Sequence, residues 1–104
     1  MHARLIIFSA KPGAADQLAA LLVQVSDGLR DAPGCLAWIV SRNPEAPEEV
    51  WVQELWESEE AAEAALAAGA TGAGPGPADV MALVDGRPSR TDLAPVGGVE
   101  FISG

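Results

Sequence analysis

The segment 50–56 constrains the fold more than any other part of the chain, because it has the pattern of a strand with large apolar side chains on both faces. Alternate side chains of a strand point to opposite faces of its sheet. One face carries Val50, Val52, Glu54 and Trp56, and the other carries Trp51, Gln53 and Leu55. The chain's own helices can cover one of these faces. The other face needs a partner surface, so this strand predicts an oligomer.

Hydrophobic periodicity predicts the elements around this strand. Short runs rich in β-branched and aromatic residues predict strands over 4–9 and 35–40, and apolar spacings of three and four predict a helix over 14–30. A polar, Pro-rich loop over 42–48 suits a hairpin. Ser58 is a good N-cap for a helix that continues to 68, followed by a Gly-rich loop over 69–77 and a short helix over 78–84. The segment 88–96 is predicted to be extended, and 99–102 to form the last short strand.

This order of strand, helix, two strands, helix, short helix and strand predicts an α+β fold. An antiparallel sheet built from two split halves, with its helices on one face, is the ferredoxin-like arrangement. A chain of 104 residues has room for one core, so residues 1–104 are expected to form a single domain.

Charge and composition narrow the classes of partner. Six Lys and Arg residues against fifteen Asp and Glu residues give a net charge of −9. Such a surface repels phosphate backbones and anionic lipid, so neither nucleic acid nor a membrane is expected as partner. No apolar run approaches the roughly 18 residues of a membrane span, and the segment 1–12 does not resemble a signal peptide. A single cysteine cannot form an internal disulfide. We therefore expect a soluble cytoplasmic protein.

The sequence offers little catalytic chemistry of the common kinds. One histidine, one cysteine and scattered carboxylates do not make a transition-metal site, so no metal is expected. We interpret His2 as a frayed surface residue, and Cys35 as a small buried apolar residue in preference to a nucleophile. The glycines of 69–77 follow a helix and lack the Gly-Lys-Ser/Thr of a phosphate-binding loop, which indicates a flexible connection or lid.

Glu54 and the three tryptophans are the candidate pocket residues. Glu54 lies mid-strand between apolar neighbours, where it either pairs with an arginine or a backbone amide or serves a pocket. Trp51 and Trp56 stand an odd number of positions apart and therefore point to opposite faces of their strand. The face of Trp38 is left open. An aromatic lining beside a Gly-rich lid suits a flat, hydrophobic small molecule.

Several short strings resemble the antibiotic biosynthesis monooxygenase domain family. They are Pro33-Gly34-Cys35-Leu36, then Glu54-Leu55-Trp56-Glu57-Ser58-Glu59-Glu60-Ala61, with Lys11-Pro12-Gly13 before the first helix and Pro95-Val96-Gly97-Gly98 near the end. The resemblance spans nearly the whole chain, and its most specific part is the Glu-x-Trp-x-Ser segment. It implies a ferredoxin-like α+β unit whose sheet pairs face to face with that of a second copy, as a homodimeric α+β barrel.

The resemblance also implies a pocket and its residues. The pocket tryptophan of the quinone-forming members matches Trp56, their asparagine matches Val52, and their tyrosine matches Ala62. The helix histidine that ligates iron in the haem-degrading members matches Ala65, so haem degradation is not expected. Trp38 completes the set of residues expected to bind substrate.

Two functions follow from this resemblance. In the first, the chain is a homodimeric monooxygenase that needs no cofactor and oxidises a small aromatic metabolite, a polycyclic phenol or anthrone, with O2. The candidate catalytic residues are Glu54, as base, and Trp56, which would pack against the ring. Arg87 or Arg90 would face the developing oxyanion.

In the second function, the chain is a non-catalytic dimeric module that binds a small hydrophobic ligand. The apolar side chains at Val52, Ala62 and Ala65, where characterised members carry polar or aromatic groups, favour this alternative.

Overall fold

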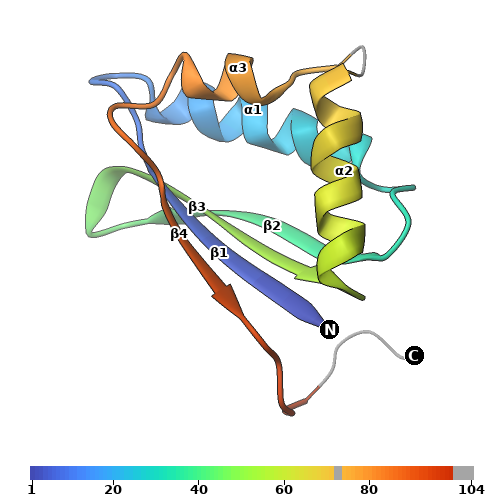
Figure 1. The fold of residues 1–104 in the computed structure, drawn as a ribbon. Helices are drawn as coiled ribbons and strands as arrows, with labels where there is room; N and C mark the ends of the chain where they lie inside the picture. The colour runs from blue at the N-terminus through green and yellow to red at the C-terminus, as the bar shows by residue number, and fades with distance from the viewer. Residues whose placement is uncertain (72–73, 100–104) are drawn as a thin grey trace.

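A computed structural model of the chain describes residues 1–71 and 74–99 (Figure 1). Its elements in chain order are β1 (His2–Ser9), α1 (Ala15–Gly28), β2 (Cys35–Asn43), β3 (Ala46–Trp56), α2 (Glu59–Thr71), α3 (Pro77–Met81) and β4 (Ser89–Leu93). Within these residues, the strands form one antiparallel sheet in the order β2-β3-β1-β4. The helices lie over one face of this sheet (Figure 1). The fold is therefore the ferredoxin-like α+β arrangement that the order of elements predicts.

The core lies between the sheet and the helices α1 and α3. Its buried apolar residues are Phe8, Ala10, Ala15, Leu18, Leu22, Val50, Val52, Val80 and Val84. Leu18, Val50 and Val52 have no exposed surface. Burial of a side chain of this size contributes about 1.5–3 kcal/mol. The apolar stripe predicted for the first helix is thus the surface that holds α1 on the sheet.

The strand register places a row of four residues across the inner face of the sheet, which is the face that the helices cover. Asp92 of β4 lies opposite Arg4 of β1. Arg4 lies opposite Glu54 of β3, and Glu54 lies opposite Trp38 of β2. Charges of alternating sign therefore run across three neighbouring strands, close to the end of β3 from which α2 continues.

The outer face of the sheet points away from the described helices (Figure 1). It carries large apolar residues together with the polar residues Ser41, Gln53, Ser89 and Thr91. The large apolar residues that the register assigns to it are Leu5, Ile7, Ile39, Trp51, Leu55 and Leu93. Ile39 is 44% exposed and Leu93 is 52% exposed. Trp51 therefore lies on the face opposite to Trp56, as the alternation within 50–56 predicts.

Several predicted boundaries differ from the structure. β2 and β3 extend into 42–48 and leave a tight turn at 44–45. Pro47 is accommodated in β3 because the pairing of β3 with β1 ends at Glu49, so its missing N–H removes no bond to β1. α2 continues through Gly69 to Thr71. The fourth strand is Ser89–Leu93, within the segment predicted to be extended. Of the strand predicted over 99–102, Val99 is not in a strand, and the residues after it lie outside the described part of the chain.

No described helix is long and apolar enough to cross a membrane.

Candidate functional site

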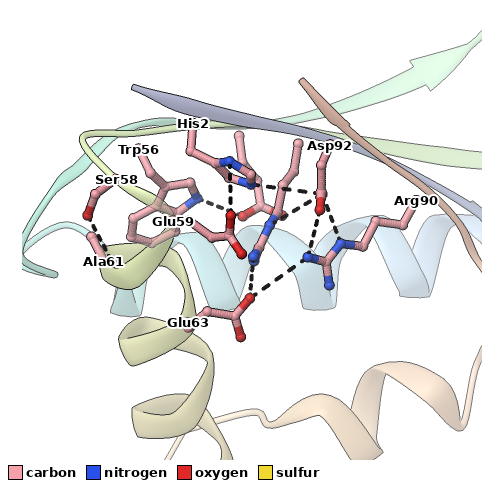
Figure 2. Close-up of polar contacts among 10 residues, drawn as sticks. His2, Trp56, Ser58, Glu59, Ala61, Glu63, Arg90 and Asp92 are labelled. Atoms are coloured by element: carbon pink, nitrogen blue, oxygen red, sulfur yellow. Dashed lines mark hydrogen bonds and ion pairs between the residues drawn. The ribbon is translucent and has the colours of Figure 1, made fainter. Parts of the chain in front are cut away.

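A cluster of charged and aromatic side chains fills the space between the inner face of the sheet and the first turns of α2 (Figure 2). We call it the polar cluster; its residues are His2, Arg4, Glu54, Trp56, Glu59, Glu63, Arg90 and Asp92. They come from β1, β3, β4 and α2. Ser58 begins α2 as predicted, because its Oγ accepts a hydrogen bond of 3.1 Å from the backbone N–H of Ala61.

Arg4 stands at the centre of the polar cluster. It is 5% exposed and is the buried charged side chain of the described residues. Its Nη2 donates a hydrogen bond of 2.6 Å to Oε1 of Glu63, one turn into α2. Its Nε lies 3.6 Å from Oδ1 of Asp92, and this Nε has no hydrogen-bond partner in the described structure. The sequence analysis did not identify Arg4 as a site residue. Its position in an apolar strand, on the side that faces the core, could have indicated a buried charge.

Glu54 is held by the indole of Trp56. The two side chains are on the same face of β3, and Nε1 of Trp56 donates a hydrogen bond of 2.8 Å to Oε1 of Glu54. Trp56 is 2% exposed, so the indole is fixed by packing. An indole N–H can only donate, so it requires an acceptor oxygen, which the carboxyl group of Glu54 supplies. The predicted partner of Glu54, an arginine or backbone amide, is therefore replaced by an indole.

The prediction for His2 is wrong. We expected a frayed surface residue, but β1 begins at His2 and pairs it with Trp56. This pairing holds the ring in the polar cluster with its side chain 14% exposed. Nδ1 lies 4.0 Å from Oε2 of Glu59, and Nε2 lies 3.9 Å from Oδ1 of Asp92. Nε2 is buried and has no hydrogen-bond partner in the described structure.

Arg90 and Asp92 form the β4 side of the polar cluster. Nε and Nη2 of Arg90 donate hydrogen bonds of 3.0 and 3.1 Å to the two oxygens of Asp92. These hydrogen bonds lower the pKa of Asp92 below its ordinary value of 3.8, and the charges of Arg90, Arg4 and His2 act in the same direction. Arg87, the other arginine considered for an oxyanion, is exposed between α3 and β4. The structure thus brings Arg90, but not Arg87, to the polar cluster.

The charges of the polar cluster do not cancel. Two guanidinium groups, of Arg4 and Arg90, face four carboxylates. With a neutral His2, the polar cluster therefore carries two excess negative charges. Carboxylates in such a setting are suited to accept protons or to attract cations. Among the described residues, however, no group of three or more His, Cys, Asp or Glu side chains is placed to hold a metal ion.

The remaining predicted pocket residues differ in how close they lie to the polar cluster and in how deeply they are buried. Trp38 lies on the inner face, opposite Glu54, and packs partly against the core. Ala62 is 2% exposed on α2, and Ala65 is half-buried one turn further on. Val52 is fully buried in the core. The structure therefore brings Trp38, Trp56 and Glu54 to one face and makes Val52 part of the core.

An open pocket of about 340 Å³ lies between the end of α1 and the start of β2. Its lining residues are Ser26, Leu29, Arg30, Cys35, Leu36, Ala37 and Trp38. Burial raises the pKa of the Cys35 thiol above its ordinary value of 9.0, and the negative charge of Glu54 adds to this increase. Cys35 is therefore protonated at neutral pH, which is unsuited to a nucleophile.

The sheet order and the polar cluster define an α+β domain of the ferredoxin-like class with a candidate site between its sheet and a helix. The sequence model of one family, antibiotic biosynthesis monooxygenase, matches residues 1–73. The chain belongs to this family.

Solved structures of similar chains cover nearly its full length. A protein from Chloroflexus aurantiacus, described as an antibiotic biosynthesis monooxygenase, is 30% identical, with 96% of this chain and 98% of that chain covered and a TM-score of 0.69. Rv0793 from Mycobacterium tuberculosis is 22% identical over 95% of this chain and 98% of that chain, with a TM-score of 0.77. A MhuD variant with two manganese protoporphyrin IX molecules bound per active site is 21% identical over 96% and 99%, with a TM-score of 0.72. The last two are similar in fold. No match was found among curated proteins.

Proposed function

We propose that this chain is a monooxygenase that needs no cofactor and oxidises a small aromatic molecule, a polycyclic phenol or anthrone, with O2. The observation that carries the proposal is the pair formed by Glu54 and the buried Trp56 on the inner face of the sheet. A carboxylate fixed by an indole is a positioned base beside an aromatic surface. Family membership supports the reaction class.

An anthrone shows how the proposed reaction balances. Glu54 takes a proton from the CH2 carbon, and the electron pair of that C–H bond enters the ring system as an anion. The anion reduces O2 and forms a C–O bond, which gives a hydroperoxide once Glu54 returns the proton. Loss of water then breaks the O–O bond and the second C–H bond and leaves the C=O of a quinone. One oxygen atom of O2 enters the product, and the other leaves as water.

The surrounding residues have simpler roles in this proposal. Trp56 and Trp38 lie on the same face of the sheet as Glu54 and are the aromatic side chains nearest to it in register. In this proposal the ring lies beside Ala62 and Ala65 of α2, whose side chains are small. Val52 forms part of the apolar floor. A site that fixes the dipoles around the anion before the reaction begins stabilises that anion.

The residues do not fit haem. α2 carries no histidine, and the only histidine of the chain, His2, lies on β1 among carboxylates. Two excess negative charges in the polar cluster also oppose the propionates of a porphyrin. The porphyrin seen with the MhuD variant therefore does not transfer to this chain.

We also propose that the chain works as a homodimer in the cytoplasm, with the outer face of the sheet covered by a second copy. In a chain in which 20% of the residues are charged, the register assigns to this face no charged residue except Glu49 at its end. Depletion of charge is typical of the centre of a protein interface.

Oxygen uptake tests the proposed reaction. A panel of anthrones and hydroquinones is offered to the wild-type chain, and at least one should consume oxygen faster than in buffer. Glu54→Gln should then lower kcat by roughly 10²-fold or more, because it removes the base. Trp56→Ala should raise KM, and because the indole is buried it should also lower the stability of the fold. Glu48→Gln, which removes an exposed carboxylate of the same strand, is the matched control.

Two results would contradict the proposed reaction. If no member of the panel consumes oxygen faster than buffer, the non-catalytic module that binds a hydrophobic ligand becomes the better function. If Glu54→Gln unfolds the domain with no separate kinetic effect, Glu54 is a structural residue.

A further inference from the structure

We propose that Arg4 binds the anionic oxygen that forms when a neutral hydroxyaromatic ligand loses its proton in the polar cluster, and that Glu63 competes with this oxygen for the guanidinium. The inference rests on the proposed function and names the chemical class of its ligand. It assigns to Arg4 the role that sequence reasoning gave to Arg87 or Arg90.

Burial makes Arg4 a fixed positive charge. Its side chain is 5% exposed, whereas that of Glu63 is 52% exposed and that of Asp92 is 42% exposed. A buried guanidinium without an anion is strongly unfavourable, so some negative group must always face it. The two carboxylates can instead turn toward water at little cost. A different anion can therefore replace the carboxylates that face Arg4, whereas Arg4 itself stays in place.

The hydrogen bonds of Arg4 leave room for another acceptor. A guanidinium has five N–H donors, and Arg4 uses one of them in its hydrogen bond to Glu63. Its Nε is buried without a hydrogen-bond partner in the described structure, and the same is true of Nε2 of His2. Both nitrogens lie within 4 Å of one oxygen, Oδ1 of Asp92. They are therefore on one side of the polar cluster, where a ligand oxygen could accept from both.

The proposed base stands next to this donor. Arg4 and Glu54 are directly opposite each other in the pairing of β1 with β3, and side chains in such a pair have Cβ atoms about 4.5–5.5 Å apart. When the ligand's O–H bond breaks, the proton goes to a carboxylate oxygen of Glu54. The electron pair stays on the ligand oxygen, where Arg4 stabilises it.

The excess negative charge of the polar cluster selects a neutral ligand. A ligand that arrives as an anion raises the excess negative charge of the polar cluster from two to three. It is therefore repelled by the carboxylates of Glu54, Glu63 and Asp92. A neutral hydroxyl brings no charge, and its ionisation moves a proton to Glu54 without changing the total charge of the polar cluster. We therefore expect a hydroxylated polycycle without a carboxylate group.

A monohydroxyanthraquinone is a suitable probe, because it is already a quinone and its absorbance changes when its hydroxyl ionises. The wild-type chain should bind it and show the ionised spectrum at a pH where the free probe is neutral. Arg4→Gln should lose this spectrum and weaken binding by at least about tenfold, and Arg4→Lys should restore part of it. Anthraquinone carboxylic acid should bind the wild-type chain more weakly than the probe.

A substitution of Glu63, which is not buried, should change the affinity for the probe in the opposite direction. Glu63→Gln removes the competing carboxylate and should tighten binding of the ionised probe by about 3- to 10-fold. Glu60→Gln removes the same charge from an exposed position of the same helix and should leave binding unchanged. If Arg4→Gln does not fold, as circular dichroism would show, this pair of variants decides the question.

The possible failures are distinguishable. An ionised spectrum that is equal in the wild-type chain and Arg4→Gln, or equal affinities of Glu63→Gln and Glu60→Gln, would overturn the role of Arg4. Binding of the probe only in its neutral form would also overturn the role of Arg4, but it would still support an aromatic ligand. Equal or tighter binding of the carboxylic acid would overturn the selectivity for neutral ligands. A wild-type chain that binds neither compound contradicts the proposed function itself.

Discussion

At the scale of single residues, Glu54 connects several observations. Its carboxylate accepts the indole N–H of Trp56, lies opposite Arg4 in the sheet, and influences the thiol of Cys35. The proposed base must be ionised in the free protein in order to take a proton. Cys35 can report this charge, because it is the only cysteine of the chain.

The reactivity of Cys35 should therefore depend on Glu54. Burial, and to a smaller extent the charge of Glu54, raise the pKa of the thiol above 9.0. The rate of alkylation by iodoacetamide follows the thiolate fraction, so its midpoint should lie above pH 9.0 in the wild-type chain and move to lower pH in Glu54→Gln. Glu48→Gln is the control. The same midpoint in all three proteins would show that Glu54 carries no charge that Cys35 senses.

At the scale of elements, the junction of β2 with α2 explains one string of the sequence. Gly34 has φ +80°, a left-handed conformation that favours glycine, and an added Cβ would lie 2.7 Å from Cβ of Ala61. The carbonyl of Gly34 also accepts a hydrogen bond of 2.8 Å from the N–H of Glu57. Glycine here lets the start of β2 approach α2, and this approach sets where α2 begins above the polar cluster.

The sequence predicts the elements well because their signals are local. The apolar stripe of α1 and the alternation within β3 depend on neighbours a few positions away, and both are confirmed. The end of the sheet that holds the polar cluster was harder to predict. Arg4, Glu54 and Asp92 come from three strands that are far apart in the chain, and strand register brings them together. Periodicity assigns a face to each residue but does not name its neighbour on the next strand.

The error for His2 has the same physical origin. A residue next to the N-terminus is frayed unless pairing holds it, and here β3 extends to Trp56 and supplies that pairing. Glu54 was predicted as a site residue from its place between apolar neighbours on a strand, and Trp56 from the family resemblance. Their interaction with each other was missed, since the prediction considered arginine and backbone amides as partners of the carboxylate.

At the scale of the whole molecule, the sheet separates two surfaces with different properties. The inner face carries the core and the polar cluster, whereas the outer face carries large apolar residues on all four strands, with Ser41 and Gln53 beside Trp51. The outer positions are adjacent in register on all four strands, so a second copy could cover them as one surface. Stable interfaces bury about 800 Å² on each partner.

The outer face should therefore hold a dimer together. Sedimentation at micromolar concentration should give twice the chain mass of 10.7 kDa. Trp51→Glu should give a folded monomer, because it places a charge at the centre of the buried surface. Val23→Glu, on an exposed position of α1, introduces the same charge elsewhere and should remain a dimer. A wild-type chain that sediments as a folded monomer would rule out the proposed barrel.

The central claim is that the polar cluster oxidises an aromatic ligand with O2 through Glu54. The most direct measurement is mass spectrometry of the quinone formed from an anthrone under heavy-isotope oxygen gas, with the initial rate recorded beside an enzyme-free control. The account predicts a quinone that contains one heavy oxygen atom, formed faster than in the control, with the rate enhancement largely lost in Glu54→Gln and retained in Glu48→Gln. A quinone that forms no faster than in the control, or equally fast in Glu54→Gln, would contradict it.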